Sequence, residues 1–261
     1  MLKAGIFLDM ENLNMNGGWG MRYEVIKELV EAQGTTVLRA NAYVAVDTSR
    51  EMRDYEYKEK AQNRREKMRL AGFHIVEKEI KRYRNSDGTE TVKANADLDM
   101  AVDALLQAEN LDYIMIGSGD GDFLRLVRAL QNKGKRVDAI AFNNVSGDLR
   151  REVDYYFPGA IIPKLLPIKH NAQKRRVRGV LDYVNDEKGY GFLSIRTGYH
   201  VTDIESGIFC HISQLTEDGV NITNDRFSTL ASSNAVIEFD RVESGRGGFQ
   251  AESAVVYQGN S

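Results

Sequence analysis

Short apolar runs alternate with helical patterns through the first 160 residues of the chain. The runs of strand length cover residues 4–9, 37–46, 73–80, 113–117 and 136–142. The segments with a helical pattern cover residues 22–33, 51–71, 97–109 and 122–133. Strand–helix–strand units repeated in this way build a mostly parallel sheet with helices on both faces. The pattern therefore predicts an α/β domain.

Several of these segments carry more detailed predictions. Residues 51–71 are highly charged and contain almost no helix breaker, so they predict one long exposed helix. In 97–109, one helix face carries an apolar stripe, made of Leu98, Val102, Leu105 and Leu106. Gly134 follows the last helical segment as its expected C′ residue. Residues 85–88 predict a tight turn between short strands at 78–84 and 89–93.

The pattern changes near residue 158. All three prolines fall between residues 158 and 167, and basic residues dominate 169–178. Beyond them, short strands are separated by glycine and polar turns with little helical signal, which predicts a small all-β barrel. We therefore expect an α/β domain over 1–162, a basic linker over 163–175 and a barrel over 176–259.

Composition narrows the possible functions. The net charge of −3 is not that of a basic nucleic-acid coat, so any nucleic-acid binding must come from local surfaces. No apolar run is long enough for a membrane helix, and no secretory signal opens the chain, which predicts a protein without a membrane partner. The single cysteine, Cys210, cannot form an internal disulfide or a four-cysteine zinc site. A reducing cytoplasm fits this cysteine content.

Aspartates follow the predicted strands where open parallel sheets place functional groups, beyond the carboxyl strand ends. Asp9 ends the first strand, Asp120 follows a strand through small residues, and Asp122 comes two residues later. Asp97 opens a helix that also carries Asp99 and Asp103. Taken alone, Asp97 and Asp122 are also good helix caps. Converging carboxylates would repel each other unless a cation neutralised them, and oxygen ligands suit Mg²⁺ or Mn²⁺. Such a metal can activate water for phosphodiester cleavage.

Three motifs in the first domain resemble those of NYN domains, which are PIN-like and LabA-type nucleases. Residues 7–13 contain Asp9 and Asn12, residues 93–103 contain Lys93, Asp97 and Asp103, and residues 116–123 read Ile-Gly-Ser-Gly-Asp-Gly-Asp-Phe. The resemblance covers about residues 3–160 and departs at Asn95, where many members have glycine. It implies a Rossmann-type α/β/α sandwich that cleaves RNA with a bound metal.

The resemblance also implies roles for individual residues. Asp9, Asp97, Asp120 and Asp122 would form the metal shell. Asn12 would orient a ligand or a phosphate, Ser118 would hydrogen-bond a carboxylate, and Asp103 would support the shell from behind.

Aromatic residues line the predicted strands of the barrel. Tyr190 and Phe192 share a strand face beside Lys188, and Phe209 and His211 repeat the pattern. Gly189 and Gly191 are expected to leave this face open. A pair of rings in the barrel core is the alternative for either pair alone, but two such pairs favour a base-stacking platform.

The same stretch, about residues 176–257, resembles a cold-shock domain. This implies a five-stranded OB-type barrel that binds single-stranded nucleic acid through Tyr183, Lys188, Tyr190, Phe192, Phe209 and His211. Tyr183 replaces a usual tryptophan, Val184 a usual phenylalanine and Asp182 a usual lysine, so we expect weaker binding than in a free-standing cold-shock protein.

The sequence thus predicts a Mg²⁺- or Mn²⁺-dependent endoribonuclease acting on single-stranded RNA, with single-stranded DNA as a second candidate ligand. It predicts no particular oligomeric state. One alternative is a non-catalytic RNA-binding or regulatory protein that uses the α/β domain as a scaffold. Phosphatase-like chemistry is weaker, because Glu11 stands where its second aspartate would be.

Overall fold

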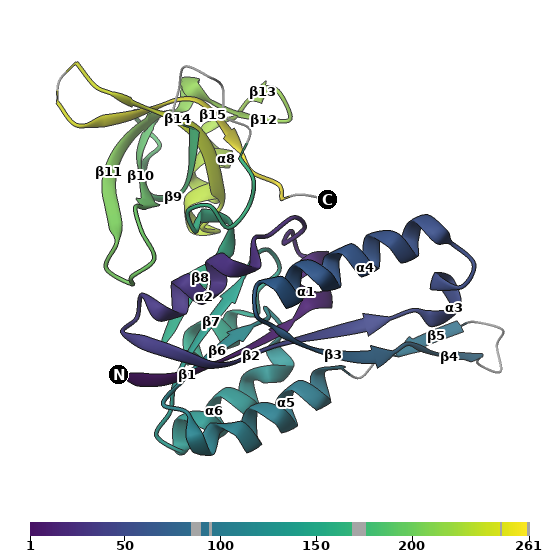
Figure 1. Cartoon of the computed structure of the whole chain (residues 1–261). Helices are drawn as coiled ribbons and strands as arrows, with labels where there is room; N and C mark the ends of the chain where they lie inside the picture. The colour runs from purple at the N-terminus through teal and green to yellow at the C-terminus, as the bar shows by residue number, and fades with distance from the viewer. Residues whose placement is uncertain (85–89, 94–95, 169–175, 246, 260–261) are drawn as a thin grey trace. The chain divides into compact units, whose positions relative to one another are not determined.

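The computed structural model describes residues 1–84, 90–93, 96–168, 176–245 and 247–259. It divides the chain into two compact units, Met1–Phe157 and Pro158–Ser261, each with its own elements (Figure 1). The predicted boundaries at 162, 175 and 259 remain predictions. None of the described helices is long and apolar enough to span a lipid bilayer.

A six-stranded sheet forms the centre of the first unit, in the order β3-β2-β1-β6-β7-β8. Its strands are β1 (Leu2–Asp9), β2 (Thr35–Val46), β3 (His74–Glu79), β6 (Tyr113–Gly117), β7 (Arg136–Ala141) and β8 (Tyr155–Pro158). The pairs β3–β2, β2–β1, β1–β6 and β6–β7 are parallel. Every residue of β6 is buried, as expected for a strand covered on both faces. The predicted parallel α/β sheet is confirmed.

Helices cover both faces of this sheet (Figure 1). They are α1 (Met10–Met15), α2 (Tyr23–Glu31), α3 (Thr48–Glu51), α4 (Tyr55–Leu70), α5 (Ala96–Gln107), α6 (Leu124–Asn132) and α7 (Gly147–Glu152). A hairpin of β4 (Lys81–Arg84) and β5 (Glu90–Lys93) stands apart from the sheet. The turn predicted between its strands lies outside the described residues. Gly134 ends α6 with φ +75°, as predicted.

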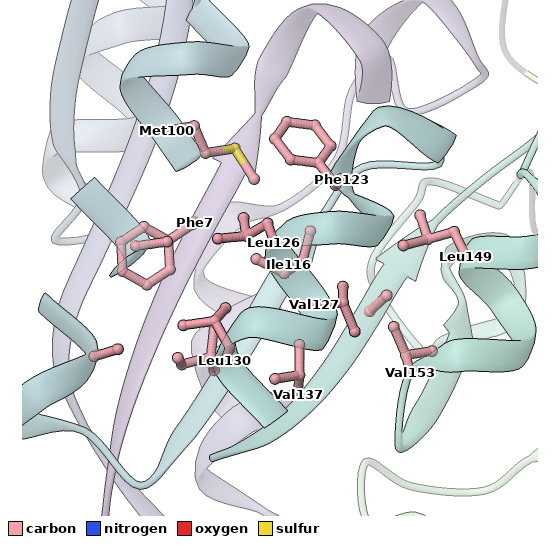
Figure 2. Packing of buried hydrophobic residues seen from close by; sticks show 14 of the residues in the cluster. Phe7, Met100, Ile116, Phe123, Leu126, Val127, Leu130, Val137, Leu149 and Val153 are labelled. Atoms are coloured by element: carbon pink, nitrogen blue, oxygen red, sulfur yellow. The ribbon is translucent and has the colours of Figure 1, made fainter. Parts of the chain in front are cut away.

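One hydrophobic core joins the sheet to α5, α6 and α7. Figure 2 shows Phe7, Ile116 and Val137 from the strands packed against Met100 of α5 and Leu130 of α6. The carboxyl ends of β1 and β6 are therefore fixed by buried apolar contacts, which gives the aspartates beyond them a rigid base.

The apolar stripe predicted for α5 is not the face that it buries. Leu98 is 63% exposed, Val102 45% and Leu106 66%, whereas Ala96, Met100, Ala104 and Ala108 are buried. Of the predicted stripe, Leu105 alone is partly packed against the core. The reason is steric: Ala96 and Ala104 of α5, and Ala108 just after it, are small enough to let the helix lie close to the sheet, where Phe7 and Tyr43 fill the remaining space.

The long helix predicted over 51–71 is confirmed as α4, which begins four residues later than predicted. α3 ends at Glu51 and α4 begins at Tyr55. Between them, the Asp54 carboxylate accepts a hydrogen bond from the Tyr57 backbone N–H at 2.9 Å, which makes Asp54 the N-cap of α4. Arg65 of α4 then pairs with Glu51 of α3 at 2.8 Å.

The second unit is a closed five-stranded barrel. Its strands are β9 (Arg176–Asn185), β10 (Tyr190–Arg196), β11 (Ile204–His211), β14 (Val236–Glu243) and β15 (Phe249–Val256). They follow the order β11-β10-β9-β14-β15, and β11 pairs with β15 to close the sheet. Two short strands, β12 (Leu215–Glu217) and β13 (Val220–Asn221), extend beyond β15. The predicted all-β barrel is confirmed.

The barrel unit also holds one helix that the sequence pattern did not predict. α8 (Asn224–Ser232) lies between β13 and β14, and it buries Phe227 and Leu230 in the barrel core. The Thr223 hydroxyl caps it by accepting from the Arg226 backbone N–H at 3.3 Å. Two buried apolar residues in a short polar segment give too weak a periodic signal to predict a helix.

The segment before the barrel contains a short 3-10 turn and buried side chains. A short 3-10 turn covers Gly159–Ile161, and Leu165 and Leu166 are buried, although they fall inside the predicted linker 163–175. Residues 169–175 lie outside the described residues. Arg176 and Arg178, which the sequence places in the basic run, belong to β9 and both pair with Glu238 at 2.8 Å.

Candidate active site and aromatic face

Asp9 lies where β1 ends and α1 begins. Its side chain is only 6% exposed. Its Oδ1 accepts a hydrogen bond from the Asn12 backbone N–H at 3.0 Å, which caps α1, and its Oδ2 accepts from Ser118 Oγ at 3.3 Å. Both carboxylate oxygens are thus held in place, one by the chain after β1 and the other by the chain after β6.

The loop after β6 is tied to the first loop by two hydrogen bonds, and a third lies within the loop after β6. Besides the bond from Ser118 to Asp9, the Gly119 backbone N–H donates to Asn12 Oδ1 at 2.9 Å, and the Asp120 N–H donates to Ser118 Oγ at 3.2 Å. Gly117 makes the close approach possible, because a Cβ there would lie 2.3 Å from Leu8 Cδ2. Asn12 and Ser118 therefore join the two aspartate-bearing loops at the same edge of the sheet.

Asp120 and Asp122 lie in the turn that leads into α6. Asp120 is half-buried, and its Oδ1 accepts from the Asp122 backbone N–H at 2.9 Å, so it caps the 3-10 turn Gly121–Phe123. Asp122 is exposed. The residue that caps this turn is therefore Asp120, and not Asp122, for which helix capping was the alternative prediction.

The carboxylates share a negative electrostatic environment. Burial, and to a lesser extent the charges of Asp97 and Glu11, raise the pKa of Asp9 to about 6. The pKa of Asp97 is also raised, first by partial desolvation and then by the charges of Asp120 and Asp122. The aspartates from β1, α5 and the loop after β6 therefore disfavour one another's ionised forms, which a bound cation would reverse.

Carboxylate oxygens are the donor chemistry that Mg²⁺ and Mn²⁺ require. Within the described residues, however, no three His, Cys, Asp or Glu side chains are grouped closely enough to hold one metal ion. The expected convergence of Asp9, Asp97 and Asp120 is therefore not formed as a ligand set. The capping bonds of Asp9 and Asp120 give a physical reason, because they direct one oxygen of each carboxylate toward a backbone N–H.

Two further aspartates of α5 are engaged with other elements. Asp103 is half-buried, and its Oδ2 accepts from the Tyr43 hydroxyl at 2.8 Å. Asp99 forms an ion pair with Lys78 of β3 at 2.7 Å. Both bonds hold α5 on the sheet, and the supporting role of Asp103 behind the carboxylates stays a prediction. Lys93 and Asn95 of the central motif have no described side chains.

Glu11 was not predicted as a site residue, because in the sequence it argues only against phosphatase-like chemistry. In the structure it is exposed at the start of α1, and its charge contributes to the raised pKa of Asp9. Its position two residues after Asp9 on the first turn of a helix is the signal that could have identified it.

The aromatic residues of the barrel lie together on β9, β10 and β11. Phe192 is opposite Phe209 in one strand pair and opposite Tyr183 in the other, and Tyr190 is opposite His211. Ring centroids are 6.2 Å apart for Tyr183 and Phe192, and 5.7 Å apart for Tyr190 and Phe209. Tyr183 is 51% exposed, and the other rings are half-buried. The residues of the predicted platform therefore share one outer face of the barrel.

Gly191 was predicted to leave the aromatic face open, but its structural role is different. Its missing side chain points into the barrel, where a Cβ would lie 2.4 Å from the Tyr183 carbonyl oxygen and 3.2 Å from Phe227. It therefore allows tight packing and does not open the aromatic face. Gly189, with φ +63°, provides the turn before β10. Lys188 is exposed beside it, and the His211 ring accepts from the Ser213 backbone N–H at 3.2 Å.

Comparison with known proteins identifies the first unit. A solved structure of a protein of unknown function from Vibrio parahaemolyticus is similar at 23% identity with a TM-score of 0.48, over 64% of this chain and 96% of that chain. A search of the curated proteins finds no match. The chain matches the NYN domain family over residues 3–163, which confirms the family resemblance of its motifs. This match spans more than half of the 261 residues and contains the two hydrogen-bonded loops that carry Asp9 and Asp120. The chain therefore belongs to the NYN domain family, whose PIN-like domains are generally nucleases.

Proposed function

We propose that the protein is a metal-dependent endoribonuclease that cleaves single-stranded RNA, and that its barrel binds the strand. The observation that carries the proposal is the pair of hydrogen bonds that joins the loops after β1 and β6. Asn12 and Ser118 hold Asp9 and Asp120 at one edge of the sheet, beside Asp97 of α5. An NYN domain with these carboxylates and their positioning residues has the kinds of side chain that metal-dependent phosphodiester cleavage requires.

Asp9, Asp97, Asp120 and Asp122 are the residues that would hold Mg²⁺ or Mn²⁺. The ion, when bound, would supply an activated water and neutralise charge on the phosphodiester. The raised pKa values of Asp9 and Asp97 support this assignment, because groups that repel each other when empty gain most from a cation. Asn12 and Ser118 act as positioning residues that fix the two loops.

The barrel supports the nucleic-acid part of the proposal through its topology and its aromatic face. Its strand order, closed between the third and fifth strands with a helix between the third and fourth, is compatible with a cold-shock or OB-type barrel. Strands two and three of such barrels carry the binding face, and here they carry Tyr190, Phe192 and Phe209. We propose single-stranded RNA as the ligand in the cytoplasm, with single-stranded DNA as the second candidate.

One observation favours the non-catalytic alternative. The described residues hold no ready ligand set for a metal, so a scaffold that binds RNA without cleaving it would need no change of side-chain positions. The two functions differ in one requirement: only the enzyme needs the carboxylates of Asp9 and Asp120.

The test is cleavage of an end-labelled single-stranded RNA by the full chain with Mg²⁺, with Mn²⁺ and with EDTA. We expect metal-dependent cleavage that Asp9→Asn and Asp120→Asn each abolish while the fold is kept. Glu109→Gln is the control, because Glu109 is an exposed carboxylate in the 3-10 turn Ala108–Asn110 before β6, at the opposite end of that strand from the site. Cleavage that persists in both site variants, or that is absent from the metal-loaded wild type, would favour the scaffold.

A further inference from the structure

A cavity of about 240 Å³ lies in the first unit beside the candidate active site. Its walls come from α1, the carboxyl end of β2, α4 and the turn after α1, and Figure 1 shows α1 and α4 on the same face of the sheet. The polar and aromatic residues that line it are Glu11, Asn14, Trp19, Tyr57 and Arg64. We call it the Trp19 pocket. Buried methionines, Met10 and Met68, form part of its apolar lining.

A glycine-rich turn presents Trp19 to this pocket. Gly17 and Gly20 flank it with φ values of +105° and +79°, a conformation that other residues rarely adopt. Gly18 must also lack a side chain, because a Cβ there would lie 2.6 Å from the Leu13 carbonyl oxygen. The turn is thus built for this shape, yet it leaves the indole ring 42% exposed.

Arg64 extends over the same ring from α4. Its guanidinium carbon lies 4.8 Å from the Trp19 ring centroid. No carboxylate of the described residues forms an ion pair with Arg64, whereas its neighbour Arg65 is buried against Glu51 at 2.8 Å. The pocket wall therefore combines an accessible aromatic ring with a cation whose charge is not neutralised by an ion pair, which is the chemistry that binds a base and its phosphate.

The Trp19 pocket adjoins the segment that carries Asp9. Met10 and Glu11, which line it, directly follow Asp9 in the chain. The pocket is smaller than the roughly 300–1,000 Å³ typical of sites for drug-sized ligands. Its size suits one flat ring system, so it would take a single nucleotide of a longer strand.

We propose that the Trp19 pocket binds one base of the single-stranded RNA next to the bond presented to the carboxylates. The base stacks against Trp19 beside Tyr57, and Arg64 contacts the adjoining phosphate. This inference rests on the proposed nuclease function and adds to it the residues that position the substrate.

The sole tryptophan of the chain makes a direct test possible, because Trp19 alone supplies the tryptophan fluorescence. The full chain carrying Asp120→Asn, which prevents cleavage under the proposed function, is titrated with a six-nucleotide single-stranded RNA and separately with each nucleoside 5′-monophosphate. We expect both kinds of probe to change Trp19 emission in a saturable way. Emission that does not respond to saturating RNA would overturn the proposal.

The role of Arg64 has its own signature in salt dependence. One phosphate contact contributes about 0.7 to the slope of log affinity against log salt for a single strand. Arg64→Ala should reduce the slope by about that amount, Arg64→Lys should keep it, and Lys133→Ala, which removes an exposed charge after α6, should leave it unchanged. Equal slopes in Arg64→Ala and Lys133→Ala would overturn the phosphate contact.

Stacking on Trp19 is tested by cleavage and binding together. In the active chain, Trp19→Ala should raise KM by roughly 5- to 150-fold, the equivalent of one lost stacked base, with little change in kcat, and Trp19→Phe should retain most of the binding. If RNA changes Trp19 emission but the wild type cleaves nothing, the nuclease proposal fails and the pocket stands. If cleavage needs Asp120 but Trp19→Ala leaves KM unchanged, the pocket fails and the nuclease stands.

Discussion

Asp9 combines two roles that oppose each other in energy. As the cap of α1 it accepts a backbone hydrogen bond, which stabilises the ionised carboxylate, but it is also buried near other carboxylates, which destabilises it. Burial is the larger effect, because the pKa rises from an ordinary 3.8 to about 6. Without a cation, the folded chain therefore carries a charge at neutral pH that weakens it.

This imbalance gives a prediction for stability in metal-free buffer. Because the folded pKa of Asp9 is raised, the folded state binds more protons than the unfolded state between about pH 4 and 6, and stability falls as the pH rises through that window. Asp9→Asn removes the charge and keeps a capping side chain. We expect it to leave stability unchanged near pH 4 and to raise the free energy of unfolding at pH 8 by up to about 3 kcal/mol.

Urea unfolding with EDTA at both pH values measures the difference. Glu109→Gln serves again as the control, because Glu109 is exposed and its substitution should change the free energy of unfolding little in either buffer. A destabilised Asp9→Asn variant at pH 8 would show that the capping bonds of the carboxylate outweigh its burial.

The sequence predicted these residues because their positions follow from local rules. Asp9 and Asp120 lie at or just beyond the ends of strands, and parallel strands bring their carboxyl ends to one edge, whereas Ser118 was expected only from the family resemblance. The partners of other aspartates could not be predicted in this way. Tyr43 lies 60 residues before Asp103, and Lys78 lies 21 residues before Asp99, so both contacts depend on how α5 is rotated on the sheet.

At the scale of elements, α5 shows why that rotation was mispredicted. It has apolar residues on two faces, and periodicity alone favours the face with larger side chains. The sheet instead accepts the small face, Ala96, Met100, Ala104 and Ala108, because Phe7 and Tyr43 already occupy the space beneath the helix. Close helix–sheet packing thus depends on the volume of the strand residues, which a helical pattern does not contain.

A pair of substitutions tests this orientation of α5. Ala104→Leu forces a larger side chain into a fully buried position and should lower the free energy of unfolding by about 1–3 kcal/mol. Leu106→Ala changes a residue that is 66% exposed and should change stability by no more than about 0.5 kcal/mol. Urea unfolding of both variants at one pH makes the comparison. The reverse order of effects would mean that the leucine stripe, and not the alanine face, meets the sheet.

Two helices, α4 and α8, differ from the prediction, and each difference has an identifiable cause. α4 begins at Tyr55, four residues into the predicted helix over 51–71, because the side chain of Asp54 caps it there. α8 exists because the barrel core takes up Phe227 and Leu230. In the first case the capping signal was present in the sequence, as an aspartate before a helical run. In the second the helix depends on tertiary packing.

At the scale of the whole molecule, the chain is two units with separate buried cores. The first core is built around Phe7, Ile116 and Leu130, and the second around Leu193, Ile208 and Phe239. The carboxylates belong to the first unit and the aromatic face to the second. Under the proposed function, the carboxylates perform the chemistry and the aromatic face holds the strand, so substitutions of the carboxylates should lower kcat and substitutions of the barrel rings should raise KM.

The aromatic face gives the prediction at this scale. Changing both Phe192 and Phe209 to alanine removes two rings from one face of the barrel. We expect binding of single-stranded RNA to weaken by about 1–3 kcal/mol for each ring, since each ring supports one stacked base. Turnover at saturating RNA should be kept, because the lost contacts hold substrate and transition state alike, so KM should rise at unchanged kcat.

Fluorescence anisotropy of a labelled RNA and steady-state cleavage by the full chain measure the two effects. Val220→Ala is the control, because Val220 is an apolar barrel residue, 68% exposed, on β13 and away from the three strands of the aromatic face. It should leave both affinity and KM unchanged. The two rings do not belong to the barrel core, which is formed instead by their strand neighbours Leu193 and Ile208. A double variant that binds RNA as tightly as the wild type would therefore show that the barrel uses this face for something other than nucleic acid.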